Sequence, residues 1–283
     1  MGSSLFFRPL RLFQFLNRVS LHAYYSARCS RLLLLFVTAN ALTFVSATAS
    51  AAPEEIQVYL DDMTRPGYFG TDVHNNYVVS GSSTPDFPGA QPPNHVYRLT
   101  PEFYYGVTDT LELGLYVLTS VNAENTTHLD GEKLRAKYIA PHDEAQGAFW
   151  GANLEIGKTN RRVSEDAWNA ELKGIYGLRS GRWIFAVNPN FDWNLSGPVN
   201  NPVSLDIDTK LAYKTDAGYQ VGFESYNELG PLRDLGHLNQ LSQTLYGVID
   251  TQLGKFDLNA GIGRGLTTAS DRWVIKFIVG FHY

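Results

Sequence analysis

The feature that most constrains the fold is a strict alternation of apolar and polar residues that recurs along the chain. The C-terminal stretch DRWVIKFIVGFHY (271–283) shows it clearly. Side chains of a β-strand alternate between its two faces, so one face here is wholly apolar and the other carries Arg272, Lys276 and His282. Such a strand suits a soluble sandwich, or a membrane barrel whose apolar face points to lipid. The apolar face consists of Trp273, Ile275, Phe277, Val279, Phe281 and Tyr283.

The same alternation recurs in twelve segments after residue 52. No stretch in that region is apolar enough for a membrane-spanning helix, and none shows convincing 3.6-residue periodicity. Most segments have about the 9–11 residues that a tilted strand needs to cross a bilayer. We therefore predict twelve strands at 67–81, 95–107, 109–121, 132–141, 146–158, 166–178, 181–195, 203–215, 217–228, 240–253, 255–265 and 271–283.

The links between these segments alternate in length. Short links lie at 107–109, 141–147, 179–181, 215–218 and 254–255, and long ones at 82–94, 122–131, 159–166, 196–202, 228–239 and 266–271. Bacterial outer-membrane barrels have short periplasmic turns and long outer loops, whereas a soluble sandwich has no reason to sort its loops by length. The sequence thus predicts an all-β fold, a single antiparallel transmembrane β-barrel of about twelve strands with up-and-down topology.

The N-terminal region has the features of an export signal. Arg28 and Arg31 precede the apolar run LLLLFVTANALTFVS (32–46), which is too short for a membrane anchor. Ala49-Ser50-Ala51 is an A-x-A cleavage site, with Ala47-Thr48-Ala49 as the alternative. We assign 1–51 to a signal peptide with a long n-region, 52–66 to a periplasmic N-terminal segment and 67–283 to the transmembrane barrel.

Cleavage after Ala51 changes the charge of the chain. It removes five of the 23 basic residues and none of the 28 acidic ones, so the mature net charge is −10. That balance argues against nucleic acid as a partner. The single cysteine, Cys29, is removed as well, so the mature chain has neither a disulfide nor a cysteine-ligated metal.

The charged residues of the predicted strands lie opposite their apolar faces. A Lys or Arg that faces lipid at mid-depth costs about 2–4 kcal/mol, so we predict that these charges line the lumen. Twelve strands lie between the eight that side chains fill and the sixteen that leave a channel, so both a narrow pore and a plug of ion pairs are open. The cations are Arg98, Arg135, Lys137, Lys173, Arg182, Lys210, Lys214 and Lys276, and the anions are Glu102, Glu112, Glu155, Glu171, Asp192, Asp206, Asp208, Glu224, Asp250 and Asp257.

Two stretches, YGVTDTLELGLYV (105–117) and FDLNAGIGRGLTTASDRWVIKFIVGF (256–281), resemble a known family. Both are similar to transporter-like outer-membrane β-barrels associated with meta-pathway phenol degradation. The shared elements are a GVTD-type turn, an LELGL strand and a G-x-G-x-T-x-x-S-D loop, here Gly263, Gly265, Thr267, Ser270 and Asp271. The resemblance implies a barrel in the outer membrane and import of aromatic or other hydrophobic compounds.

The end of the chain carries a second resemblance. Phe281 and Tyr283 in the last strand resemble the C-terminal signal by which outer-membrane barrels are recognised for insertion. The expected partners are therefore outer-membrane lipid, the barrel-assembly machinery and a small-molecule substrate. The expected location is the outer membrane of a Gram-negative bacterium, with both termini in the periplasm.

Three functions are consistent with these features. A passive channel or transporter for small molecules is favoured over a structural or interaction barrel with a plugged lumen. A lipid hydrolase is disfavoured, because Ser225 and Ser242 have no hydrolase motif around them. We expect no metal or cofactor, because 128–132 and 142–146 lack a defined ligand spacing and the glycine-rich 261–265 leads into a strand rather than a helix.

Overall fold

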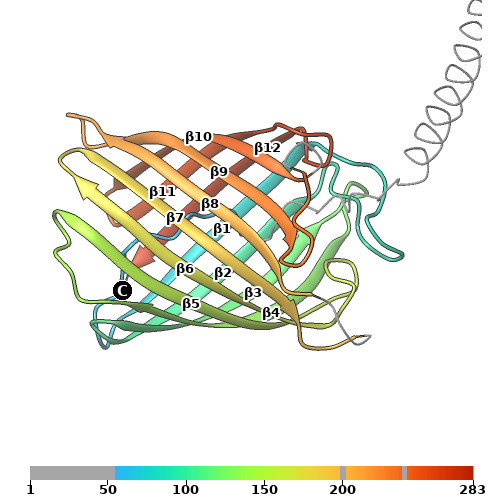
Figure 1. The fold of residues 1–283 in the computed structure, drawn as a ribbon, viewed down its shortest axis with the longest axis horizontal. Helices are drawn as coiled ribbons and strands as arrows, with labels where there is room; N and C mark the ends of the chain where they lie inside the picture. The colour runs from blue at the N-terminus through green and yellow to red at the C-terminus, as the bar shows by residue number, and fades with distance from the viewer. Residues whose placement is uncertain (1–54, 198–201, 238–240, 283) are drawn as a thin grey trace, which may run out of the picture. The chain divides into compact units, whose positions relative to one another are not determined.

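The protein is a closed barrel of twelve antiparallel strands (Figure 1). This computed structural model describes residues 55–197, 202–237 and 241–282. The predicted all-β, twelve-stranded architecture is confirmed. The strands are β1 (Phe69–Ser80), β2 (Tyr97–Thr108), β3 (Leu111–Val121), β4 (Thr127–Ile139), β5 (Gly147–Thr159), β6 (Trp168–Ser180), β7 (Trp183–Asn194), β8 (Ser204–Lys214), β9 (Gln220–Pro231), β10 (Gln243–Leu253), β11 (Phe256–Gly265) and β12 (Trp273–His282).

Each strand pairs with its neighbours in sequence, and the barrel closes where β12 pairs with β1. The closing register runs from Gly70 opposite His282 to Ser80 opposite Trp273. Closure leaves no strand edge with unpaired backbone groups. Within the described ranges, no helix is long and apolar enough to cross a membrane.

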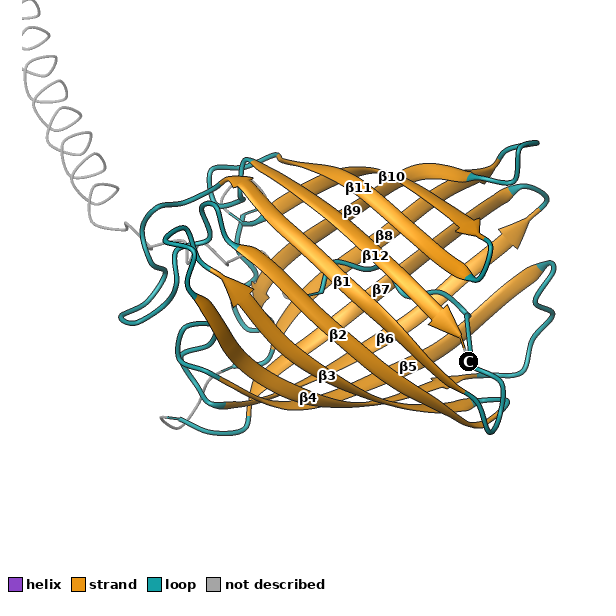
Figure 2. Cartoon of the chain, turned by 180° about the vertical axis from the view of Figure 1, so that it is seen from behind, coloured by secondary structure: helices purple, strands orange, loops and turns teal. Residues whose placement is uncertain are grey.

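The links between strands are sorted between the two ends of the barrel, which Figure 2 shows from behind. The two-residue links 109–110, 181–182 and 254–255 lie at one end, which we call the turn end. The longer links 81–96 and 160–167 lie at the other, which we call the loop end. Length sorting fails for one pair, because 122–126 at the loop end is shorter than 140–146 at the turn end.

The exception arises in β4, which begins five residues earlier than the predicted 132. The pairing register of β3 with β4 shifts between Leu118 and Thr119, which leaves Asp130 as an extra residue. Such a β-bulge interrupts the alternation of faces. Leu129 and Glu132, three residues apart, are therefore both exposed, and the sequence pattern did not show that the strand continues through this point.

The outer face of the barrel is apolar. Exposed large hydrophobic side chains come from all twelve strands. Aromatic pairs from neighbouring strands encircle the turn end. These pairs are Phe69–Tyr105, Tyr138–Trp150, Trp183–Tyr213 and Phe256–Phe281, with ring centroids 4.7–6.0 Å apart.

Charged side chains on this outer face lie near the loop end and contact aromatic rings. Lys158 Nζ lies 6.0 Å from the ring centroid of Trp168, and the Arg264 guanidinium lies 4.9 Å from that of Trp273. Long basic side chains beside Trp are typical of the boundary between an apolar layer and water. The outer surface therefore has an apolar belt bounded at both ends by aromatic residues.

Candidate functional site

The interior of the barrel is occupied by the chain itself. Residues 55–66, which we call the inner segment, run through it from the loop end to the turn end (blue in Figure 1). Ile56, Val58 and Tyr59 are 1%, 3% and 3% exposed. The predicted periplasmic position of 52–66 is wrong for the described part of this segment, 55–66, which lies in the lumen.

Side chains of the barrel wall hold the backbone of the inner segment. The Tyr59 N–H donates to Asn188 Oδ1 over 2.6 Å, and Asn188 Nδ2 donates to the Tyr59 carbonyl over 3.2 Å. Lys276 donates to the carbonyl of Ile56 over 3.0 Å, and Lys137 to that of Asp62 over 2.6 Å. Buried backbone groups need hydrogen-bond partners, and here the lumen wall supplies what a neighbouring strand would otherwise provide.

Many of the predicted lumen charges pair with one another. On β2, β3 and β4, Arg135 Nη2 lies 2.5 Å from Glu102 and 2.7 Å from Glu112. On the opposite wall, Glu224 pairs with Lys276 and, over 3.0 Å, with Lys210. Lys210 also lies 2.9 Å from Asp250. Buried charges need partners of opposite sign, and these two networks provide them on either side of the inner segment.

The Glu224 network also anchors the inner segment, and Lys276 is its central residue. We expect Lys276→Met to lower the free energy of unfolding by about 3–5 kcal/mol, because one cation of a buried network is lost and the Ile56 carbonyl loses its donor. Thermal unfolding, followed by the heat-dependent shift in gel mobility, measures this. Lys255→Met, in the exposed turn 254–255, is the control. Equal melting temperatures for the two variants would contradict the anchoring role.

The other predicted lumen residues line the interior with one clear exception. Arg182 precedes β7, its side chain is 52% exposed, and it pairs with Asp216 in the next turn. The prediction is wrong for Arg182, because β7 begins one residue after it and its side chain therefore lies in an exposed turn. Arg98 and Glu155 are buried, Lys173 lies 3.2 Å from Glu171, Asp192, Asp206 and Asp208 line the interior near the loop end, and Lys214 and Asp257 line it near the turn end.

Two parts of the sequence analysis fall on residues outside those described. Tyr283 and the signal peptide 1–51 are among them, so the assembly signal and the cleavage site stay predictions. Phe281 belongs to β12 and stacks edge-on against Phe256, with ring centroids 5.0 Å apart. The described chain begins near the loop end and ends near the turn end, so a common side for the two true termini also stays a prediction.

Several lumen residues other than Lys, Arg, Asp and Glu were missed by reasoning from charge alone. Asn188 and His74 are fully buried and Tyr116 is 1% exposed. The Tyr116 hydroxyl lies 2.6 Å from that of Tyr59 in the inner segment. Alternation could have found Asn188 and Tyr116, because each is four residues from a predicted lumen charge on its own strand, Asp192 and Glu112. No lumen charge was predicted on the strand of His74.

One group of side chains has the composition of a metal site. Within the described residues, Asp72, His74 and Glu102 bring ligand atoms within 4.8 Å of one another. However, the Arg135 guanidinium lies 2.5 Å from Glu102, and Tyr104 donates to Asp72 over 2.9 Å. A cation beside that guanidinium would be repelled, so we interpret the group as part of the ion-pair network.

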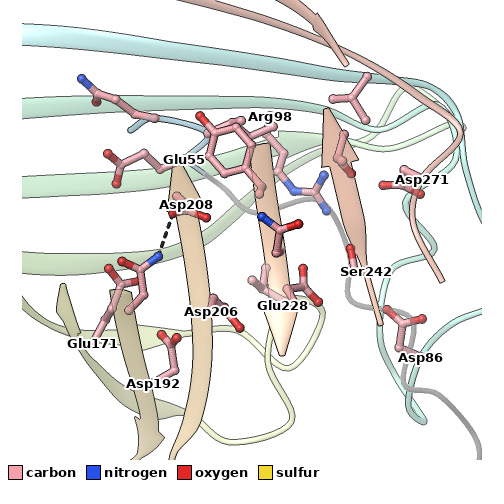
Figure 3. A pocket seen from close by; sticks show the side chains of 18 of the residues that line it. Glu55, Asp86, Arg98, Glu171, Asp192, Asp206, Asp208, Glu228, Ser242 and Asp271 are labelled. Carbon is pink, nitrogen blue, oxygen red and sulfur yellow. Dashed lines mark hydrogen bonds between the residues drawn. The ribbon is translucent and has the colours of Figure 1, made fainter. Parts of the chain in front are cut away.

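Two polar cavities meet at the inner segment. The loop-end cavity has a volume of about 490 Å³ and is lined by nine acidic and four basic described residues (Figure 3). The turn-end cavity has a volume of about 730 Å³ and is lined by eight acidic and four basic described residues. Gln57 contributes to both. The lumen is therefore wide and acidic at each end and closed down by the inner segment between them.

At the turn end the inner segment is held by charges. Asp61 pairs with Arg179 of β6, and His142 Nε2 lies 2.9 Å from Asp61 Oδ2. Burial lowers the pKa of His142, but its contacts with the Ala140 carbonyl and with Asp61 outweigh burial, so its pKa is raised above the usual value. The protonated imidazole therefore adds to the hold on the inner segment.

This pairing predicts a pH dependence. A histidine whose pKa is raised on folding contributes stability that is complete below its unfolded pKa of about 6.5 and is lost as pH rises through the folded pKa. We expect a thiol at Leu60→Cys to react about two- to fivefold faster as pH rises through that range, after correction for thiol ionisation. Adding His142→Gln should abolish the excess. A rate that follows thiol ionisation alone in both variants would contradict the role of His142.

The closed barrel with its apolar outer belt and polar interior defines an outer-membrane-type β-barrel, and a solved channel has a similar fold. The chain is similar to the COG4313 outer membrane channel from Pseudomonas putida F1, with 14% identity, coverage of 81% of this chain and 100% of that one, and a TM-score of 0.57. It is also similar to the NanC porin, with 11% identity, 74% and 97% coverage and a TM-score of 0.49. No family profile matches the sequence, and no curated protein sequence does.

Proposed function

We propose that this protein is an outer-membrane channel for small solutes, and that its own N-terminal segment narrows the lumen. The observation that carries the proposal is the inner segment itself, held through side chains of the wall between two polar cavities. A barrel with a solid core would have no cavity at either end. The solved barrel of similar fold from Pseudomonas putida F1 is an outer membrane channel, which supports the same class for this chain.

The outer surface supports a membrane location. An apolar belt with aromatic residues at its ends matches a bilayer with its two interfaces. We place the turn end in the periplasm, because short turns lie on that side of outer-membrane barrels. The last strand then ends on the periplasmic side, where Phe281 would be presented to the barrel-assembly machinery.

The lining of the lumen bears on the kind of solute. Acidic side chains outnumber basic ones in both cavities, and an acidic lining favours cations over anions. We therefore propose small polar or cationic solutes rather than the aromatic or hydrophobic ones that the family resemblance implies. The connection to phenol degradation rests on that resemblance alone.

Conductance in planar bilayers tests the proposal. The purified mature protein should give small, discrete current steps, and its reversal potential in a salt gradient should show cation preference. Heat-treated, unfolded protein from the same preparation serves as the control. Absence of current from the wild type and also from a variant that lacks the inner segment would contradict a channel.

A plugged structural barrel is the second candidate, and the dense pairing around Glu224 favours it. In that case the inner segment never leaves and no current flows. A lipid hydrolase finds no support, because Ser225 donates its hydroxyl proton to Asn227 and Ser242 lines the loop-end cavity rather than the outer rim. The same recordings separate channel from plug.

A further inference from the structure

Five carboxylates follow the wall of the loop-end cavity on four consecutive strands. They are Glu171 of β6, Asp192 of β7, Asp206 and Asp208 of β8, and Glu228 of β9, and we call them the acidic arc (Figure 3). Glu171 is directly opposite Asp192, and Asp206 is directly opposite Glu228. Like charges that face each other across neighbouring strands destabilise a sheet. The arrangement therefore requires a compensating interaction.

The protein supplies only part of this compensation. Lys173 lies 3.2 Å from Glu171, Asn190 Nδ2 donates to Asp208 over 2.7 Å, and Glu228 also has an interaction partner. Within the part of the chain that the structure describes, Asp192 and Asp206 form neither a hydrogen bond nor an ion pair. This differs from Glu224, which two lysines neutralise. Asp192 and Asp206, at the centre of the acidic arc, thus have no counter-ion in direct contact, although Lys173 acts on both of them from a longer range.

A neutral side chain beside the arc indicates the same missing donor. Asn190 lines the cavity and is 5% exposed, and its Oδ1 has no hydrogen-bond partner among the described residues. A buried carbonyl oxygen without a donor is unfavourable. Asn190 is directly opposite Asp206 in the register. An acceptor and unpaired carboxylates at one place are complementary to a cation that carries N–H donors.

We propose that the acidic arc binds a linear organic polycation, an oligoamine with ammonium groups separated by short alkyl chains. Neighbouring strands lie about 4.8 Å apart and alternate residues of a strand about 7 Å apart, which an oligoamine can follow. A single metal ion needs oxygens that converge within about 2.6 Å of it, and no arc residue belongs to the one group of described residues with ligand atoms within 4.8 Å. A cavity of about 490 Å³ accommodates a small linear molecule.

The role of this site as the place where solutes enter rests on the proposed channel function, but binding itself does not. Calorimetric titration of spermidine into the mature protein in detergent measures binding without a membrane. We expect saturable binding that weakens with salt. Asp192→Asn with Asp206→Asn should weaken it about tenfold, because two charge contacts are lost. Glu144→Gln with Asp257→Asn removes two charges from the turn-end cavity instead and should leave it unchanged.

Two results would overturn the proposal. One is the absence of spermidine binding to the wild type, whether or not Mg²⁺ binds instead, and the other is equal weakening by both double variants. If the wild type conducts but does not bind spermidine, the binding site is contradicted and the channel function stands. If the wild type and the variant that lacks the inner segment both bind spermidine but carry no current, the channel function is contradicted and the binding site stands.

Discussion

Deletion of residues 52–62 should raise the single-channel conductance several-fold. The loop-end and turn-end cavities meet at the inner segment, so its removal joins them into one water-filled path. Twelve strands enclose more space than their own side chains fill. The barrel itself should survive, because water solvates the wall groups, Asn188 and Lys276 among them, that the inner segment leaves behind.

The deletion is measured in planar bilayers, and the heat-dependent shift in gel mobility shows that the barrel is intact. A matched variant, Asn188→Ala, keeps the inner segment but removes both hydrogen bonds to the Tyr59 backbone. It should give the wild-type current with added transitions to the larger conductance. An intact deletion barrel with wild-type conductance would show that the inner segment does not limit the path.

Ile275→Arg should strongly reduce assembly in the membrane. Ile275 is 44% exposed on the outer face of β12, between Tyr77 of β1 and Ile262 of β11. An arginine facing lipid costs up to about 2–4 kcal/mol at mid-depth and less toward the interfaces, and Ile275 lies two residues from Trp273 at the loop-end boundary. The amount of folded, heat-modifiable protein in the outer-membrane fraction measures the loss.

The control places the same side chain inside the barrel. Thr244→Arg on β10 introduces an arginine into the acidic loop-end cavity and should assemble normally. Val274, next to Ile275, is unsuitable because it is 1% exposed and packs in the same cluster as Ile56 and Tyr246 of the interior. Equal losses for Ile275→Arg and Thr244→Arg would contradict the assignment of the two faces.

Prediction from the sequence worked best where the pattern is local. Strand bounds agree within a few residues for most strands, because lipid on one side and a polar interior on the other impose a period of two. It failed at bulges, where an extra residue reverses the parity. The extra residue Asp130 interrupts the alternation near the start of β4, which the sequence therefore placed too late. A register shift between Leu205 and Asp206 likewise accompanies β9, which ends later than predicted.

The lumen charges show the same division. Parity placed Arg135, Glu224 and Lys276 on the inward face, but it carries no information on which strands lie across the lumen from each other. The pairing of Lys276 with Glu224 joins residues 52 positions apart in sequence. Arg182 shows the opposite error. Its position in the alternation is that of an inward-facing residue, but it lies one residue before β7, in a turn outside the strand.

The sequence by itself determined the wall of this protein, since alternation, strand length and link length are properties of neighbouring residues and of the two solvents they meet. Only the tertiary structure decided what the wall encloses. The inner segment binds to the barrel wall through its backbone carbonyls and N–H groups. Such groups are common to nearly all residues, so no side-chain pattern predicts this segment. Likewise, the acidic arc exists because the pairing register of β6 to β9 places Glu171 opposite Asp192 and Asp206 opposite Glu228, and that register is a property of the folded sheet.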